Sequence, residues 1–232
     1  MTIAIMGAMP EEITPLLEII GEHETISYAA NKYYKGKYAG LDVVVAYSKI
    51  GKVNAALTAS TLIEKFGAEK LLFSGVAGAV SPELKVGDLI IASKLAQHDL
   101  DITAFGHPYG FVPEGKQFVD ADKSLNALAL KVASSLDLKL KEGVIATGDQ
   151  FIANIERKDW IEATFKADAL EMEGASVAVV CDALNIPFFI LRAISDAADM
   201  DASFSFDEFL ETSAVESAEF VMKMVDKIVL PS

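Results

Sequence analysis

Cysteine is almost absent from this chain of 232 residues: Cys181 is the only one, so no disulfide can form within the chain. Cys181 lies in an apolar run, where a small buried thiol is a more ordinary interpretation than a nucleophile. Apolar runs of about 18 residues, the length of a membrane span, are missing as well. The N-terminus also lacks the basic region of a secretory signal. These absences favour a cytoplasmic protein.

Positive charge is also scarce. Lys and Arg together number 20 against 34 Asp and Glu, which gives a net charge of −14, and the only arginines are Arg157 and Arg192. A chain of this charge repels nucleic acid and anionic membranes, so neither is an expected partner. Arginine is the side chain best suited to bind phosphate through two hydrogen bonds, so a polyphosphate pocket would be hard to build here.

Signatures of cofactor and metal sites are missing too. The glycines of the segment 75–78 do not form GxGxxG, and no GxxxxGK[ST] occurs anywhere in the chain. The histidines His23, His98 and His107 show no metal-ligand spacing. His98 precedes an aspartate, but no GxSxG motif accompanies the pair. We therefore expect no cofactor and no metal.

Strand-like and helix-like segments alternate along the chain. This alternation predicts an α/β fold with a single domain over residues 1–232. We expect an α/β/α sandwich with a central mixed, mostly parallel, twisted sheet flanked by helices. The segment 98–117 is a long loop with aromatic residues, which is typical of a functional or interfacial segment. The expected strands are 2–6, 26–38, 41–47, 70–73, 88–92, 143–147, 169–172 and 187–194, and the expected helices are 10–20, 52–66, 123–136, 155–165, 175–184 and 206–228.

Acidic residues collect where predicted strands end. Buried parallel strands deliver functional groups at their carboxyl ends, so these acids indicate a cleft lined with carboxylates and glycines. Each acid has an ordinary alternative: Glu12 as a partner of a helix dipole, Glu171 or Glu173 as the partner of a Lys or Arg, and Asp149 or Asp196 as a turn or cap residue.

Eight short motifs follow one another along the chain. They are GAMPEE at 7–12, SKIGKV at 48–53, SGVAG at 74–78, DITAFG at 101–106, GDQFI at 148–152, EME at 171–173, RAISD at 192–196 and SFDEF at 205–209. Together they resemble the 5′-methylthioadenosine/S-adenosylhomocysteine nucleosidases, of the nucleoside phosphorylase/hydrolase superfamily. The sequences of 46–52 and 73–78 are most similar to the subgroup that also cleaves 6-amino-6-deoxyfutalosine. The chain departs from some relatives at Val76, where they have Ser, and at His107, where they have Tyr.

The resemblance implies hydrolysis of an N-glycosidic bond, with a nucleoside and water as substrates and adenine as a product. Asp196, positioned by Ser195, would protonate N7 of the leaving adenine, which requires a pKa raised by burial. Glu12 would activate the attacking water, and Glu173 would accept hydrogen bonds from the ribose hydroxyls. This division between an acid and a base parallels the inverting glycosidases.

The resemblance also implies the binding residues. Phe151 would stack on adenine, the backbone of Ile152 would recognise the edge of the base, and Met172 would pack on the sugar. Val76 would contribute to the pockets for the base and for the 5′ substituent.

An apolar pocket for the 5′-alkylthio group would be lined by Met9, Ile50 and Phe206, because a thioether offers little to hydrogen-bond. In the family, the loop from Phe105 to Pro113 comes from the neighbouring subunit and closes this pocket, which predicts a homodimer.

Three alternatives stay open. A phosphorylase of the same fold would need several cations for its phosphate nucleophile, and Glu12 would repel that phosphate. A non-catalytic nucleoside-binding module would have no need of both a water-facing Glu and a leaving-group Asp. A plain interaction protein predicts no such set of residues. The sequence does not rank methylthioadenosine, S-adenosylhomocysteine, 5′-deoxyadenosine and aminodeoxyfutalosine as substrates.

Overall fold

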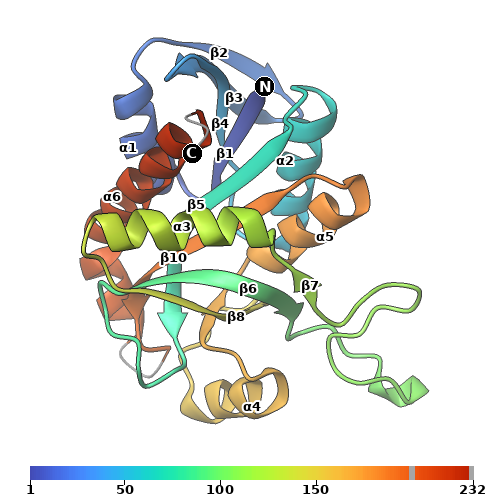
Figure 1. Ribbon diagram of the computed structural model, residues 1–232. Helices are drawn as coiled ribbons and strands as arrows, with labels where there is room; N and C mark the ends of the chain where they lie inside the picture. Colours follow the sequence, from blue (N-terminus) through green and yellow to red (C-terminus); the bar gives the residue numbers. More distant parts are fainter. Residues whose placement is uncertain (199–201, 230–232) are drawn as a thin grey trace.

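The computed structural model describes residues 1–198 and 202–229, and its ten strands join one mixed sheet (Figure 1). The order is β10-β6-β8-β9-β5-β1-β4-β3-β2, with β7 paired to β6. The strands are β1 (Thr2–Gly7), β2 (His23–Tyr28), β3 (Asn31–Tyr38), β4 (Leu41–Tyr47), β5 (Lys70–Ala79), β6 (Leu89–Gln97), β7 (Val119–Asp120), β8 (Leu140–Thr147), β9 (Ala169–Glu171) and β10 (Phe188–Asp196). The helices are α1 (Pro10–Ile20), α2 (Lys52–Glu64), α3 (Lys123–Ser135), α4 (Ile155–Phe165), α5 (Gly174–Leu184) and α6 (Ala202–Val229).

The α/β class and the mixed sheet are confirmed, but part of the sheet is closed. β10 pairs with both β5 and β6, so β5, β10, β6, β8 and β9 form a small barrel. The register shifts between Ile194 and Asp196 in β10 and between Ala92 and Lys94 in β6, and such irregularities increase the twist that closure requires. Among the described residues five strand pairings are parallel and five are antiparallel. The sheet is therefore mixed in equal parts, whereas a mostly parallel sheet was expected.

Helices cover the centre of the sheet, where strands such as β1, β5 and β10 are buried on both faces. α2 and α5 pack together on one side, around a core that includes Leu62 and Cys181. α6 packs against α1, β5 and β10 on the other, with Leu16 and Val221 in that core (Figure 1). Cys181 is fully buried, as the more ordinary interpretation of this residue predicted. In the described part of the chain, no helix combines the length and the apolar character that crossing a membrane would demand.

Two differences from the expected elements matter. The segment 26–38 contains parts of two strands, which turn at Ala29 and Ala30 with φ of 48° and 56°, whereas Gly36 lies inside β3. β5 and β10 are longer than predicted, because their parallel ladder continues from Phe188 to Asp196. The motifs SGVAG and RAISD therefore lie within strands, which hold their side chains in a fixed register.

Candidate active site

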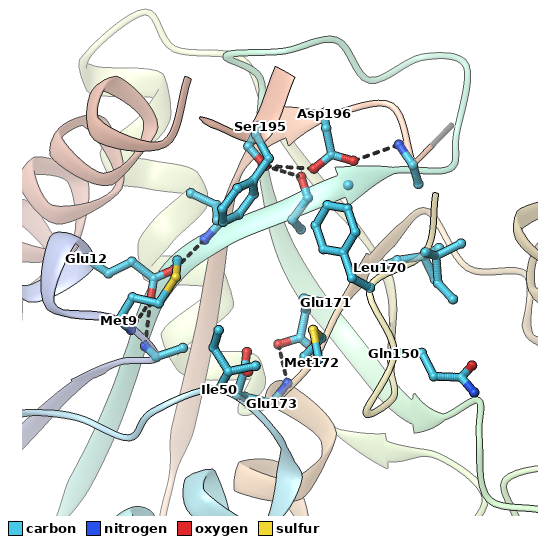
Figure 2. Close-up of a pocket in the computed structure, with 18 residues that line it drawn as sticks. Met9, Glu12, Ile50, Gln150, Leu170, Glu171, Met172, Glu173, Ser195 and Asp196 are labelled. Atoms are coloured by element: carbon cyan, nitrogen blue, oxygen red, sulfur yellow. Dashed lines mark hydrogen bonds between the residues drawn. The ribbon is translucent and has the colours of Figure 1, made fainter. Parts of the chain in front are cut away.

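A cavity of about 290 Å³ opens beside the carboxyl ends of β1, β5, β9 and β10, near the lower end of the range of small-molecule sites (about 300–1,000 Å³) (Figure 2). Phe105 and Pro113 are not among the residues that line it, and Phe105 is 82% exposed on a loop that projects from the rest of the chain (Figure 1). Eleven residues predicted for the site do line it: Met9, Glu12, Ile50, Val76, Phe151, Ile152, Met172, Glu173, Ser195, Asp196 and Phe206.

Glu12 is held by backbone donors at the start of α1. Its Oε2 accepts hydrogen bonds from the N–H groups of Ala8 and Met9, and its Oε1 accepts one from Val76 N at 3.1 Å. The residue is only 3% exposed, and burial raises the pKa of its carboxyl above 4.5, against the opposing effects of the Arg192 charge and these hydrogen bonds. Glu12 thus has a fixed orientation and an increased proton affinity.

Glu173 is the residue that precedes the first turn of α5. Its Oε1 accepts a hydrogen bond from Gly51 N at 2.8 Å, which ties the turn that carries Ile50 to the floor of the cavity. Burial raises the pKa of Glu173, and the negative charge of Glu171 raises it further. Both effects disfavour the ionised form, and they raise the pKa of Glu173 to about 8.

Glu171 and Glu173 make different contacts, although only Met172 separates them. Glu171 pairs with Arg192, at 2.7 Å between Oε2 and Nη2, and both side chains are buried. The predicted alternative that one of the two glutamates pairs with a cation is therefore confirmed for Glu171. The sequence spacing could not say which one, because β9 ends at Glu171 and α5 begins directly after Glu173.

Asp196 lies across the cavity at the end of β10 (Figure 2). Ser195 Oγ donates a hydrogen bond to Oδ2 at 2.9 Å, and Ala198 N donates one to Oδ1 at 2.8 Å. Asp196 is 3% exposed and Ser195 is fully buried. The turn role that was the ordinary alternative for Asp196 is also present, since its side chain accepts from the backbone two residues on.

Apolar side chains form the remaining walls. The rings of Phe151 and Phe206 meet edge to face, with 5.7 Å between their centroids. Ile50 and Phe151 are about half exposed, so the cavity opens to solvent beside them. Sequence reasoning gave no role to several lining residues, among them Ala77, Gly78, Leu170 and Gln150. Ala77, Gly78 and Leu170 are small or apolar and carry no chemical signal of their own, although Gly78 lies within the motif SGVAG and Gln150 within GDQFI.

The chain is similar to known proteins over almost its whole length. The family model described as "Phosphorylase superfamily" matches residues 2–228. The chain is 60% identical to the aminodeoxyfutalosine nucleosidase of Campylobacter jejuni, over 98% of this chain and all of that one. It superimposes with a TM-score of 0.97 on the 5′-methylthioadenosine/S-adenosylhomocysteine nucleosidase of Helicobacter pylori with butyl-thio-DADMe-Immucillin-A, at 53% identity, covering 97% and 98% of the two chains. A mutant of the Helicobacter pylori protein with 5′-methylthioadenosine in its active site matches at 52% identity, with the same TM-score and coverage.

Proposed function

The chain belongs to the phosphorylase superfamily, and we propose that within it the protein is a nucleosidase, which hydrolyses the N-glycosidic bond of 5′-methylthioadenosine, S-adenosylhomocysteine and 6-amino-6-deoxyfutalosine and releases adenine. One observation carries hydrolysis in particular. The cavity is lined by four carboxylates, those of Glu12, Glu171, Glu173 and Asp196, and none of its described lining residues is Lys or Arg.

Carboxylates suit this reaction because its transition state resembles an oxocarbenium ion, with positive charge on the ribose. Asp196 protonates N7 of the departing adenine, while Ser195 fixes the orientation of its carboxyl. Glu12 removes a proton from the attacking water, and burial has raised its proton affinity for that step. Glu173 accepts hydrogen bonds from the ribose hydroxyls and stabilises the positive charge.

The remaining walls bind the substrate. Phe151 stacks on adenine, the backbone of Ile152 recognises its edge, and Met172 packs on the ribose. Val76 lies between Glu12, which accepts its backbone N–H, and the base. Apolar surface for the 5′ substituent comes from Met9, Ile50 and Phe206.

Phosphorolysis is disfavoured by charge. A phosphate nucleophile is an anion that needs cationic ligands, and the buried cation Arg192 is already paired with Glu171. Lys52, beside the cavity, is paired with Asp99 at 2.6 Å. Glu12 would in addition repel phosphate at the place where the nucleophile must attack. Water is the nucleophile that this arrangement accepts.

We infer a homodimer in which the loop from Phe105 to Pro113 covers the cavity of the partner subunit. Exposed apolar side chains begin at the cavity and continue along α2: Ile50, which lines the cavity, is 54% exposed, and on α2 Val53 is 79% and Leu57 51% exposed. Val53 and Leu57 are four residues apart on α2 and so share one face. Phe105 provides a matching exposed ring. Exposed apolar surface of this extent is typical of an interaction site.

We also infer a cytoplasmic location, which is consistent with a chain whose single thiol, Cys181, is buried and free. The function is tested by chromatography of the products from methylthioadenosine, S-adenosylhomocysteine, 5′-deoxyadenosine and aminodeoxyfutalosine. We expect free adenine from the nucleosides with a 5′ substituent. Tight binding without release of base would favour the non-catalytic binding module instead.

A further inference from the structure

Both carboxylate oxygens of Glu171 accept hydrogen bonds from the protein, although the residue lines the cavity. Its Oε2 accepts hydrogen bonds from Arg192 Nη2 at 2.7 Å, Gly174 N at 2.7 Å and Glu173 N at 3.1 Å. Its Oε1 accepts one from the hydroxyl of Thr147. The proposed mechanism gives this buried acid no task. Since both oxygens are occupied, any task it has is performed through its neighbours.

The first neighbour is Arg192, which lies close to Glu12. Its guanidinium stacks over the Phe73 ring at 4.0 Å and is 1% exposed. A Cβ at Gly75 would come within 2.7 Å of Glu12 Oε1 and within 3.2 Å of Arg192 Nη1, so the cation and the proposed base meet beside this glycine. Glu171 holds the other side of the guanidinium.

The second neighbour is the first turn of α5. Glu171 accepts the N–H groups of Glu173 and Gly174, and Thr147 Oγ1 accepts that of Ala175 at 2.8 Å. These are donors that the start of a helix leaves without partners in the helix itself. The pair of Glu171 and Thr147 therefore fixes the backbone from which the Glu173 side chain extends into the cavity (Figure 2).

We propose that Glu171 is a positioning residue of the nucleosidase, which fixes Arg192 beside Glu12 and fixes the turn that carries Glu173. One buried carboxylate thereby sets the geometry and the charge of the base and of the ribose acceptor together. This inference rests on the proposed function.

The charged and titratable groups that face Glu171 determine the effect of pH. They are Arg192 on β10, Glu12 on α1, Glu173 before α5 and His98 after β6. Burial lowers the pKa of His98 to about 4, so this imidazole is neutral in the range of an assay. The Glu171 charge raises the pKa of Glu173. Removal of the Glu171 charge therefore lowers the pKa of Glu173.

The test compares Glu171→Gln with the wild type and with Glu142→Gln, a matched variant. Glu142 also accepts a side-chain hydrogen bond, from Asn126 at 2.8 Å, but lines no part of the cavity. We expect Glu171→Gln to lower kcat by about 10- to 100-fold, the scale of a small misplacement of catalytic groups. We also expect the acidic limb of its kcat/KM profile to move to lower pH, which a merely structural defect would not produce. Glu142→Gln should match the wild type in both.

Glu171→Asp keeps the charge and shortens the reach, so its kcat should fall while its acidic limb stays near that of the wild type. Circular dichroism establishes that each variant is folded. An unmoved acidic limb in Glu171→Gln overturns the proposal, and so does a failure of both Glu171 variants to fold. A wild type that releases no adenine would instead overturn the proposed function on which the inference rests.

Discussion

Gly78 lies directly against the carboxyl group of Asp196. A Cβ at this position would come within 2.7 Å of Oδ1, closer than real Cβ atoms approach a neighbour. The partner strands β5 and β10 bring the two residues together, because Asp196 pairs with Gly78 in their parallel ladder. Gly75, three residues earlier, leaves equivalent room for the carboxyl group of Glu12. The two glycines of the motif SGVAG thus make space for the two carboxyls that we propose as the acid and the base.

Gly78→Ala should therefore displace Asp196 and lower kcat by about 100-fold, since a shift of about 1 Å in a catalytic group has an effect of that size. Gly36→Ala is the control: its Cβ would also be crowded, by the Ile20 side chain at 2.9 Å, but Gly36 lines no part of the cavity. Steady-state release of adenine gives kcat for both variants. Equal activity of the two variants would contradict the role assigned to Gly78.

Glu12→Gln should lower kcat by about 10²- to 10⁴-fold, the usual contribution of a general base. Binding should remain, because glutamine keeps the shape of the side chain. Isothermal titration with a stable substrate analogue measures that binding. Glu11→Gln changes the neighbouring exposed residue in the same helical turn and should be fully active. A Glu12→Gln variant with wild-type turnover would remove Glu12 from the mechanism.

Glu173 is expected to reduce stability at neutral pH in the protein without ligand. Its folded-state pKa is raised above 4.5, so its contribution to stability is complete below pH 4.5 and is lost as pH rises through the folded-state pKa. Glu173→Gln cannot ionise, so its Tm should exceed that of the wild type at pH 8 and approach it near pH 4.5. Thermal melts at both pH values provide the measurement. A lower Tm for Glu173→Gln at pH 8 would show that the ionised carboxylate stabilises the fold.

Val53→Asp should separate the proposed dimer, because it introduces charge at an apolar side chain that is 79% exposed on α2. KM for methylthioadenosine should then rise, since the partner loop no longer covers the cavity. Val215→Asp is the matched control, at another exposed valine in a helix. Light scattering after size exclusion gives the mass in solution. A wild type that elutes as a monomer would argue against the shared pocket.

The sequence predicted the acids that line the cavity more completely than the architecture around them. Glu12, Glu173 and Asp196 lie in short motifs whose local chemistry is visible in a single chain, and the structure gathers them around one cavity. Closure of the barrel depends on pairing between β10 and β6, strands about a hundred residues apart, and local periodicity does not encode such pairing.

The pairing of Arg192 with Glu171 could not be predicted either, since spacing alone does not distinguish Glu171 from Glu173.

Phe105 and Pro113 illustrate another limit of prediction from one chain. Their predicted place is on a second copy of the chain, so one chain can show only that they lie away from its own cavity.

The most direct test of the account is release of adenine from methylthioadenosine in phosphate-free buffer and again with phosphate, with the sugar product identified by mass spectrometry. The arrangement of Glu12, Glu173 and Asp196 predicts equal rates in the two buffers and free methylthioribose as the sugar. Release that requires phosphate and yields a sugar phosphate would contradict hydrolysis and remove Glu12 as the base.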